Sequence, residues 1–255
     1  MTAVVTALAR RSIRNTFRRP QFIAPILLMP TLFLAVNTGG AHSATSLPGF
    51  PKVASLLDFE LAGAMMQASM LAGVSGGIAL AMDIEMGFTD RLLAAPIARP
   101  AIVLGRLGAT AAMGVLLAVW FLALGLVFGA SIHAGVAGVA LIVALVPLAA
   151  LAFGSVGTAL ALWAGRASVV QGIFPLVFVV VFLSSAFFPR GLLREPARSI
   201  ADYNPMSFIA EGVRNPILGS ISGTETLKAL LGIAIVGVIG ATLSSLGLRH
   251  RLRAA

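Results

Sequence analysis

The chain has 255 residues, of which 58% are hydrophobic and 11% are charged, and its formal net charge is +9. Soluble domains carry about 25% charged residues and about 45–50% apolar residues, so this composition excludes soluble globular, disordered and coiled-coil classes. The chain has no cysteine, which excludes disulfides, zinc fingers and thiol nucleophiles. The composition predicts an all-α integral membrane protein.

The first element that we predict is a helix over residues 2–19, lying along the membrane surface. Its apolar residues share one broad face and its arginines gather on another: Val4, Val5, Leu8, Ile13 and Phe17 against Arg10, Arg11, Arg14 and Arg18. This pattern is typical of a basic interfacial helix. The alternative is a plain basic flank with incidental amphipathicity.

Six charge-free stretches are long enough to cross a membrane, which takes about 20 apolar residues. They lie at about residues 22–41, 61–82, 107–132, 134–165, 167–189 and 229–248. Pro25 and Pro30 make the first the weakest candidate, and Pro147 predicts a kink in the fourth. A cleaved signal peptide at the first stretch is disfavoured, because five arginines precede it and five spans follow.

The distribution of basic residues predicts the orientation. With six spans both termini lie on one side of the membrane, and 12 of the 18 basic residues fall on that side. The positive-inside rule therefore predicts a multi-pass protein of the cell membrane with both termini cytoplasmic. By the same topology the whole net charge belongs to the cytoplasmic face, so the basic character marks orientation and predicts no nucleic-acid partner.

The loop between the second and third spans is unusually specialised. Three acids open it, a short apolar helix at residues 91–95 follows, and Pro96 is expected to end that helix. On charge alone it reads as a solvated loop that obeys the positive-inside rule. A compact helix flanked by acids and arginines also fits a docking element for a cytoplasmic partner.

A second segment with several motifs follows the fifth span. It contains Phe187-Phe188-Pro189, then Tyr203-Asn204-Pro205-Met206-Ser207, then Glu211-Gly212-Val213-Arg214. Residues 206–213 are mostly apolar and place Glu211 and Arg214 on one helix face, which predicts a short helix at the outer interface. An ordinary extracytoplasmic cap is the alternative.

Several kinds of chemistry have no residues to support them. No G-x-x-x-x-G-K-[ST] phosphate loop occurs, so the chain is not expected to bind ATP by that route. The G-x-S-x-G match at residues 73–77 lies mid-span, so we interpret Gly73 and Gly77, like Gly125 and Gly129, as packing positions. We predict no catalytic residue and no metal site. The acids fall at span ends or in loops, which argues against an ion-coupled carrier.

The run from Glu85 to Arg99 resembles the loop after the second span in ABC-type-2 permeases, the membrane subunits of ATP-driven exporters for drugs, lipo-oligosaccharides and polysaccharides. In that family the loop forms a coupling helix against the ATPase. Asp90 replaces a more usual Glu, and Phe88 a small residue. The resemblance assigns coupling roles to these residues: Asp83, Glu85, Gly87, Asp90, Arg91, Leu92, Leu93, Pro96 and Arg99.

The outer segment resembles the family's long external loop, whose short helices dip into the outer leaflet. Its motif residues are Pro189, Asn204, Pro205, Glu211 and Arg214. The resemblance covers nearly the whole chain and implies one transmembrane domain over residues 1–255.

The resemblance implies a permease that exports an amphiphilic or apolar substrate, such as a drug, a lipid or a lipid-linked saccharide. Its partners would be an ABC ATPase subunit that binds ATP and Mg, a second permease subunit that is expected to be identical, and membrane lipid. The chain itself would not be an enzyme. The main alternative is a stand-alone secondary carrier or channel, and a more distant one is a membrane scaffold without transport activity.

Overall fold

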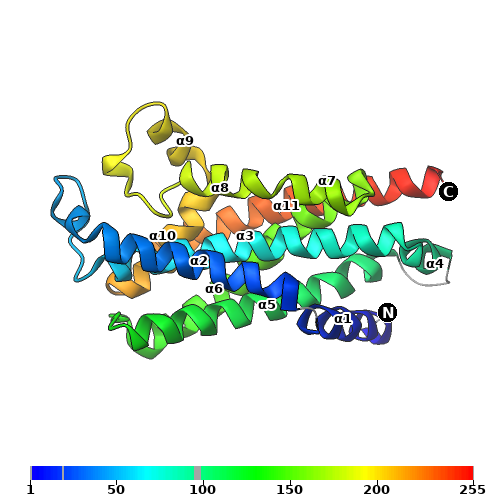
Figure 1. Cartoon of the computed structure of the whole chain (residues 1–255), viewed down its shortest axis with the longest axis horizontal. Helices are drawn as coiled ribbons and strands as arrows, with labels where there is room; N and C mark the ends of the chain where they lie inside the picture. The colour runs from blue at the N-terminus through cyan, green and yellow to red at the C-terminus, as the bar shows by residue number, and fades with distance from the viewer. Residues whose placement is uncertain (1, 19, 95–98, 255) are drawn as a thin grey trace.

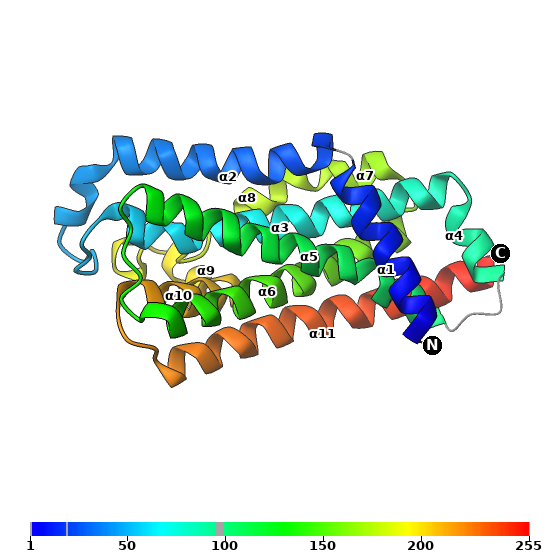
Figure 2. The same ribbon diagram turned by 90° about the horizontal axis from the view of Figure 1, so that it is seen from below.

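The computed structural model describes residues 2–18, 20–94 and 99–254, and every regular element within these ranges is a helix. The long helices run side by side along one axis (Figures 1 and 2). Both ends of the chain lie at the same end of this bundle, which we call the terminal end. The opposite end, where α9 and α10 lie, is the distal end. The predicted all-α fold is confirmed.

Among the described residues, five helices are long and apolar enough to cross a membrane. They are α2 (Pro20–Gly40), α3 (Leu56–Glu85), α5 (Arg99–Val127), α6 (Gly135–Ala164) and α11 (Gly223–Ala254). Their apolar stretches within these bounds match five of the six predicted spans. The structure therefore supports a multi-pass membrane protein.

The helix ends differ from the predicted ones for local reasons. Helix α2 continues through Pro25 and Pro30, which the sequence analysis had treated as interruptions. Helix α5 ends at Val127, ahead of the predicted residue 132, because Gly129 turns the chain with φ 88°. Helix α11 continues past the predicted residue 248 to Ala254.

The predicted fifth span is not one helix. Residues 167–189 contain α7 (Ala167–Gly172) and α8 (Phe174–Phe182), and the chain leaves the helical path after Phe182. Pro175 lacks a backbone N–H, and Gly172 is a weak helix former, so the helix breaks between them. Together they form a shorter apolar segment, Ala167–Phe182, which runs along the bundle from the terminal toward the distal end (Figure 1).

The centre of the bundle is α3, which packs against α6 through glycines. A Cβ atom on Gly73 or Gly77 would lie less than 3.0 Å from the backbone of Phe153 or Gly157, so the two helices touch backbone to backbone. The predicted packing role of Gly73 and Gly77 is confirmed. Gly125 also packs closely, but Gly129 has open space around it and serves the turn instead.

Helix α1 (Thr2–Phe17) crosses α5 at the terminal end (Figure 2). Gly105 and Gly108 of α5 leave room for Leu8 and Ala9, so the apolar face of α1 packs on the bundle. The predicted division of faces has two exceptions, because Arg11 turns inward and Phe17 is exposed.

Short elements close the distal end. They are η1 (His42–Ser46), η2 (Arg190–Leu192), α9 (Ala197–Tyr203) and α10 (Pro205–Leu218). The predicted helix over residues 206–213 is the central part of α10. Most of its side chains are buried, and it packs against α3, α6 and α11.

Candidate functional site

Residues 83–99, the predicted coupling loop, join α3 to α5 at the terminal end. Its first turn depends on Gly87, whose φ of 66° is accessible to glycine at little cost. This turn ends α3 and starts α4 (Phe88–Ala94), three residues before the predicted helix start at Arg91. In both views α4 lies beyond the end of α3, at the edge of the bundle (Figures 1 and 2).

The side chains of α4 are only partly described. Arg91 is exposed and Leu92 is half-buried. Asp90, Leu93 and Arg99 have helical backbone, but the placement of their side chains lies outside the described part of the chain, and Pro96 lies in the undescribed stretch 95–98. Arg91 is therefore the described charged side chain of α4 that is open to a partner.

Asp83 belongs to an ion cluster made of Arg11, Asp83 and Arg106. The carboxylate atom Oδ2 accepts a hydrogen bond from Nη1 of Arg11 at 3.3 Å and another from Nη2 of Arg106. The guanidinium of Arg11 also lies over the ring of Phe88, 3.7 Å from its centroid. The ion cluster thus joins α1, α3 and α5, and Phe88 connects α4 to it.

Glu85 makes a different internal contact. Its Oε1 accepts a hydrogen bond from the backbone N–H of Ala167 at 3.0 Å, so the carboxylate satisfies a free N–H at the start of α7. Asp83 and Glu85 therefore hold the coupling loop to the bundle through these contacts.

At the distal end, Glu211 of the predicted outer motif forms an ion pair with Arg190. Arg190 donates two hydrogen bonds to Glu211, at 2.7 and 2.9 Å, and one to Asp202 at 2.8 Å. Burial lowers the pKa of Arg190, but the hydrogen bonds and charges of Glu211 and Asp202 outweigh it and raise that pKa. Glu211 thus pairs with Arg190 and not with Arg214, the residue that shares its helix face. Pro189 is buried directly before Arg190.

Arg214 is buried and binds backbone carbonyls. Its guanidinium donates to the carbonyl oxygens of Phe59 at 2.8 Å, Ser185 at 3.0 Å and Ala186. It also stacks over the Phe59 ring, 3.8 Å from the centroid. Burial lowers its pKa to about 10, so the side chain still carries its charge at neutral pH.

Asn204 fastens the end of α8 to the start of α10. Its Nδ2 donates to the carbonyl oxygens of Val180 and Leu183, both at 3.0 Å, while its Oδ1 caps α10 by accepting from the N–H of Met206. Pro205 takes the first helical position, where a missing N–H costs nothing. The outer motif is therefore a set of caps and ties that close the distal end.

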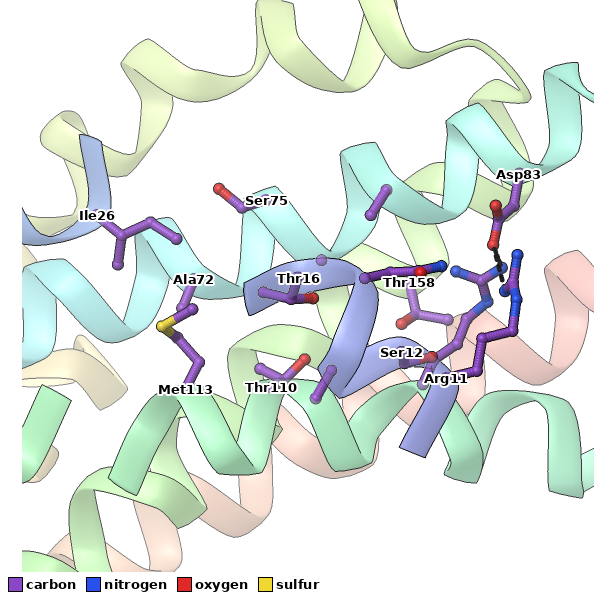
Figure 3. A pocket seen from close by; sticks show the side chains of 15 residues that line it. Arg11, Ser12, Thr16, Ile26, Ala72, Ser75, Asp83, Thr110, Met113 and Thr158 are labelled. Carbon is purple, nitrogen blue, oxygen red and sulfur yellow. Dashed lines mark hydrogen bonds and ion pairs between the residues drawn. The ribbon is translucent and has the colours of Figure 1, made fainter. Parts of the chain in front are cut away.

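A partly open cavity lies beside the ion cluster, lined by residues of α1, α2, α3, α5 and α6 (Figure 3). Its volume is about 70 Å³, and Arg11, Asp83 and Arg106 line it. Within the described residues, no three His, Asp or Glu side chains are grouped so as to hold a metal ion.

Sequence reasoning missed the partners of the acids. Arg11 was placed on the solvent face of the first helix, and Arg106 and Arg190 were counted only as loop charges. A usable signal existed for one pair, because Asp83 and Arg106 are the charges at adjoining ends of consecutive apolar stretches. No comparable sequence signal marks Arg11 or Arg190.

The five long apolar helices of the described residues define a multi-pass membrane protein. The family model of the ABC-2 type transporter matches residues 3–218. The chain belongs to this family and is a permease subunit of an ABC transporter. It is also 27% identical, over 205 residues, to "Daunorubicin resistance ABC transporter permease protein DrrB1" of Streptomyces coeruleorubidus. The match covers 79% of this chain and 70% of that protein.

Proposed function

We propose that the chain exports an amphiphilic or apolar substrate, driven by ATP that a separate ATPase subunit hydrolyses. The observation that carries this proposal is the placement of α4. It protrudes at the terminal end, exposes Arg91 and contacts the ion cluster through Phe88. A force applied to α4 would reach α1, α3 and α5 along these contacts.

The direction and the substrate class rest on two further points. The relative is named for resistance to daunorubicin, and resistance through a transporter requires outward movement. The exposed faces of the long helices carry Leu, Val, Ile, Met and Trp side chains, which suits a membrane path for drugs, lipids or lipid-linked saccharides.

The orientation follows from charge. The terminal end carries α1, the coupling loop and the end of α11, with 12 of the 18 basic residues on the side assigned to it. This end faces the cytoplasm, where the ATPase is present. Residues 167–182 complete a sixth crossing, and a second permease subunit, expected to be identical, completes the pathway. ATP and Mg bind to the ATPase.

The docking role of α4 is tested by co-purification with a candidate partner, a Walker-motif ATPase subunit co-expressed with this chain. Arg91→Glu reverses the exposed charge on α4, and we expect it to lower recovery of the ATPase at least fivefold. Arg14→Glu is the matched control, because Arg14 is also exposed near the terminal end but lies on α1. Equal recovery with Arg91→Glu and wild type would remove the docking assignment.

A further inference from the structure

The residues that line the cavity beside the ion cluster carry a net charge. Arg11 and Arg106 bring two positive charges and Asp83 one negative charge, so the lining carries one net positive charge. Both arginines bond the same atom, Oδ2 of Asp83. Because each guanidinium has five N–H donors, donors on both remain for another acceptor.

Uncharged donors surround the same space. Ser12, Asn15, Thr16, Ser75 and Thr110 line the cavity, and their side chains make no hydrogen bond with the part of the chain that the structure describes. Thr110 is buried and the other four are half-buried, so a molecule in the cavity can reach their polar atoms. A set of five without protein partners, next to two arginines, points to an occupant that accepts hydrogen bonds.

The cavity is polar at one end and apolar at the other. In Figure 3 the Arg11–Asp83 pair lies at one side, and Ile26, Ala72 and Met113 lie together at the opposite side. A volume of about 70 Å³ holds about five water molecules, at about 10–15 Å³ of cavity for each. A headgroup with its first carbons fits this space, but a whole lipid does not.

We propose that this cavity binds the phosphate group of an anionic amphiphile from the leaflet next to α1. One phosphodiester charge balances the net charge of the lining, and its oxygens accept from the free guanidinium and hydroxyl donors. The first carbons of the amphiphile lie toward Ile26 and Met113. The site lies within one chain, and its occupancy is independent of ATP and of the ATPase.

The test uses the purified full chain in dodecyl maltoside, with native mass spectrometry to count bound lipid. Dioctanoyl phosphatidylglycerol is compared with zwitterionic dioctanoyl phosphatidylcholine and with inorganic phosphate. We expect one phosphatidylglycerol per chain, bound at least fivefold more tightly than phosphatidylcholine. Equal retention of the two lipids would overturn the proposal, and equal retention of inorganic phosphate would overturn its assignment to an amphiphile.

Two substitutions of equal size separate the cavity from the rest of the surface. Ala79→Leu fills the cavity without changing any charge, because Ala79 lines it. Ala123→Leu adds the same side chain on an exposed position of α5. We expect the first to reduce phosphatidylglycerol binding to the phosphatidylcholine level and the second to leave it unchanged. Loss of binding in neither variant, or in both, would contradict the proposal.

Charge is tested in the same way with two arginines of α1. Arg11→Gln removes a charge from the cavity, whereas Arg14→Gln removes one from an exposed position. We expect at least tenfold weaker binding for the first and less than twofold for the second.

Thr110→Val keeps the shape of the cavity and the ion cluster and removes one hydrogen-bond donor, so it serves if the other variants fold poorly. It should weaken binding about fivefold, as expected for one hydrogen bond, and wild-type affinity in Thr110→Val would contradict the proposal.

Discussion

At the scale of single residues, Arg214 shows how a membrane protein accommodates irregular backbone. The chain leaves the helical path after Phe182, and the carbonyls of Ser185 and Ala186 then lack helical partners. Buried backbone groups of this kind must be hydrogen-bonded by other parts of the protein. Arg214 supplies the donors and also holds the first turn of α3 through Phe59.

Arg214→Met should therefore destabilise the protein by about 3 kcal/mol, because it leaves the buried carbonyl groups of Ser185 and Ala186 without this donor and removes the bond to Phe59. The measurement is the unfolding free energy from titration of the detergent-solubilised protein with sodium dodecyl sulfate. Arg198→Met is the control, since Arg198 is exposed on α9, and it should change stability by less than about 0.5 kcal/mol. A loss below about 1 kcal/mol in Arg214→Met would contradict this role.

A second prediction at this scale concerns the strengths of the two ion pairs in the ion cluster. The Arg106 side chain is 13% exposed and that of Arg11 is 36% exposed, so solvent screens the Arg11–Asp83 pair more strongly. Double-mutant cycles with Asp83→Asn should give a coupling energy of about 1–3 kcal/mol with Arg106→Gln and less than about 1 kcal/mol with Arg11→Gln. The reverse order of the two coupling energies would show that burial does not determine which ion pair is stronger.

At the scale of helices, glycine sets how closely α3 approaches α6. Gly77→Ala places a Cβ less than 3.0 Å from the Gly157 carbonyl oxygen, so the helices must separate. Such overpacking costs about 1–3 kcal/mol, which thermal unfolding in detergent would detect. Gly39→Ala is the matched control, because a Cβ there meets nothing within 4 Å. Equal stability of the two variants would rule out backbone contact between α3 and α6.

The turn at Gly87 sets the direction in which α4 leaves the end of α3, and we expect that direction to affect ATP-driven transport. Gly87→Ala should cost about 1 kcal/mol, because an L-residue is strained at φ 66°, and it should also reorient α4. Gly129→Ala carries a similar strain, at φ 88°, but lies at the distal end. We expect ATP-driven transport to fall at least fivefold in Gly87→Ala only. Equal transport by both variants would show that the geometry of α4 is unimportant for coupling.

At the scale of the whole molecule, the features predicted correctly from the sequence are those that depend on local runs of apolar or small residues. Apolar length placed the five long helices, and small-residue spacing identified the contact made by Gly73 and Gly77. The outer-motif residues lie in neighbouring elements at the distal end, although Glu211 pairs with Arg190 and not with Arg214. Their local context, Asn204 before Pro205 above all, carries helix-start chemistry that can be read without the fold.

The parts that the sequence did not predict depend on contacts between distant segments. Arg11 lies on α1, and only the packing of that helix against α5 brings it to Asp83, 72 residues later. Arg190 meets Glu211 in the same way, after the chain has turned through α9. The break at Pro175 was missed because an apolar run was judged by length, without weighing the lost N–H.

The central claim is that a permease moves its substrate with ATP hydrolysed by a separate subunit. The most direct measurement reconstitutes the chain in proteoliposomes, with and without the Walker-motif ATPase, and follows daunorubicin as the transported probe. We predict uptake into inside-out proteoliposomes only when the ATPase and hydrolysable ATP are both present, and none with a non-hydrolysable analogue. Uptake by the chain alone, driven by a gradient and indifferent to ATP, would contradict the account and favour a stand-alone carrier.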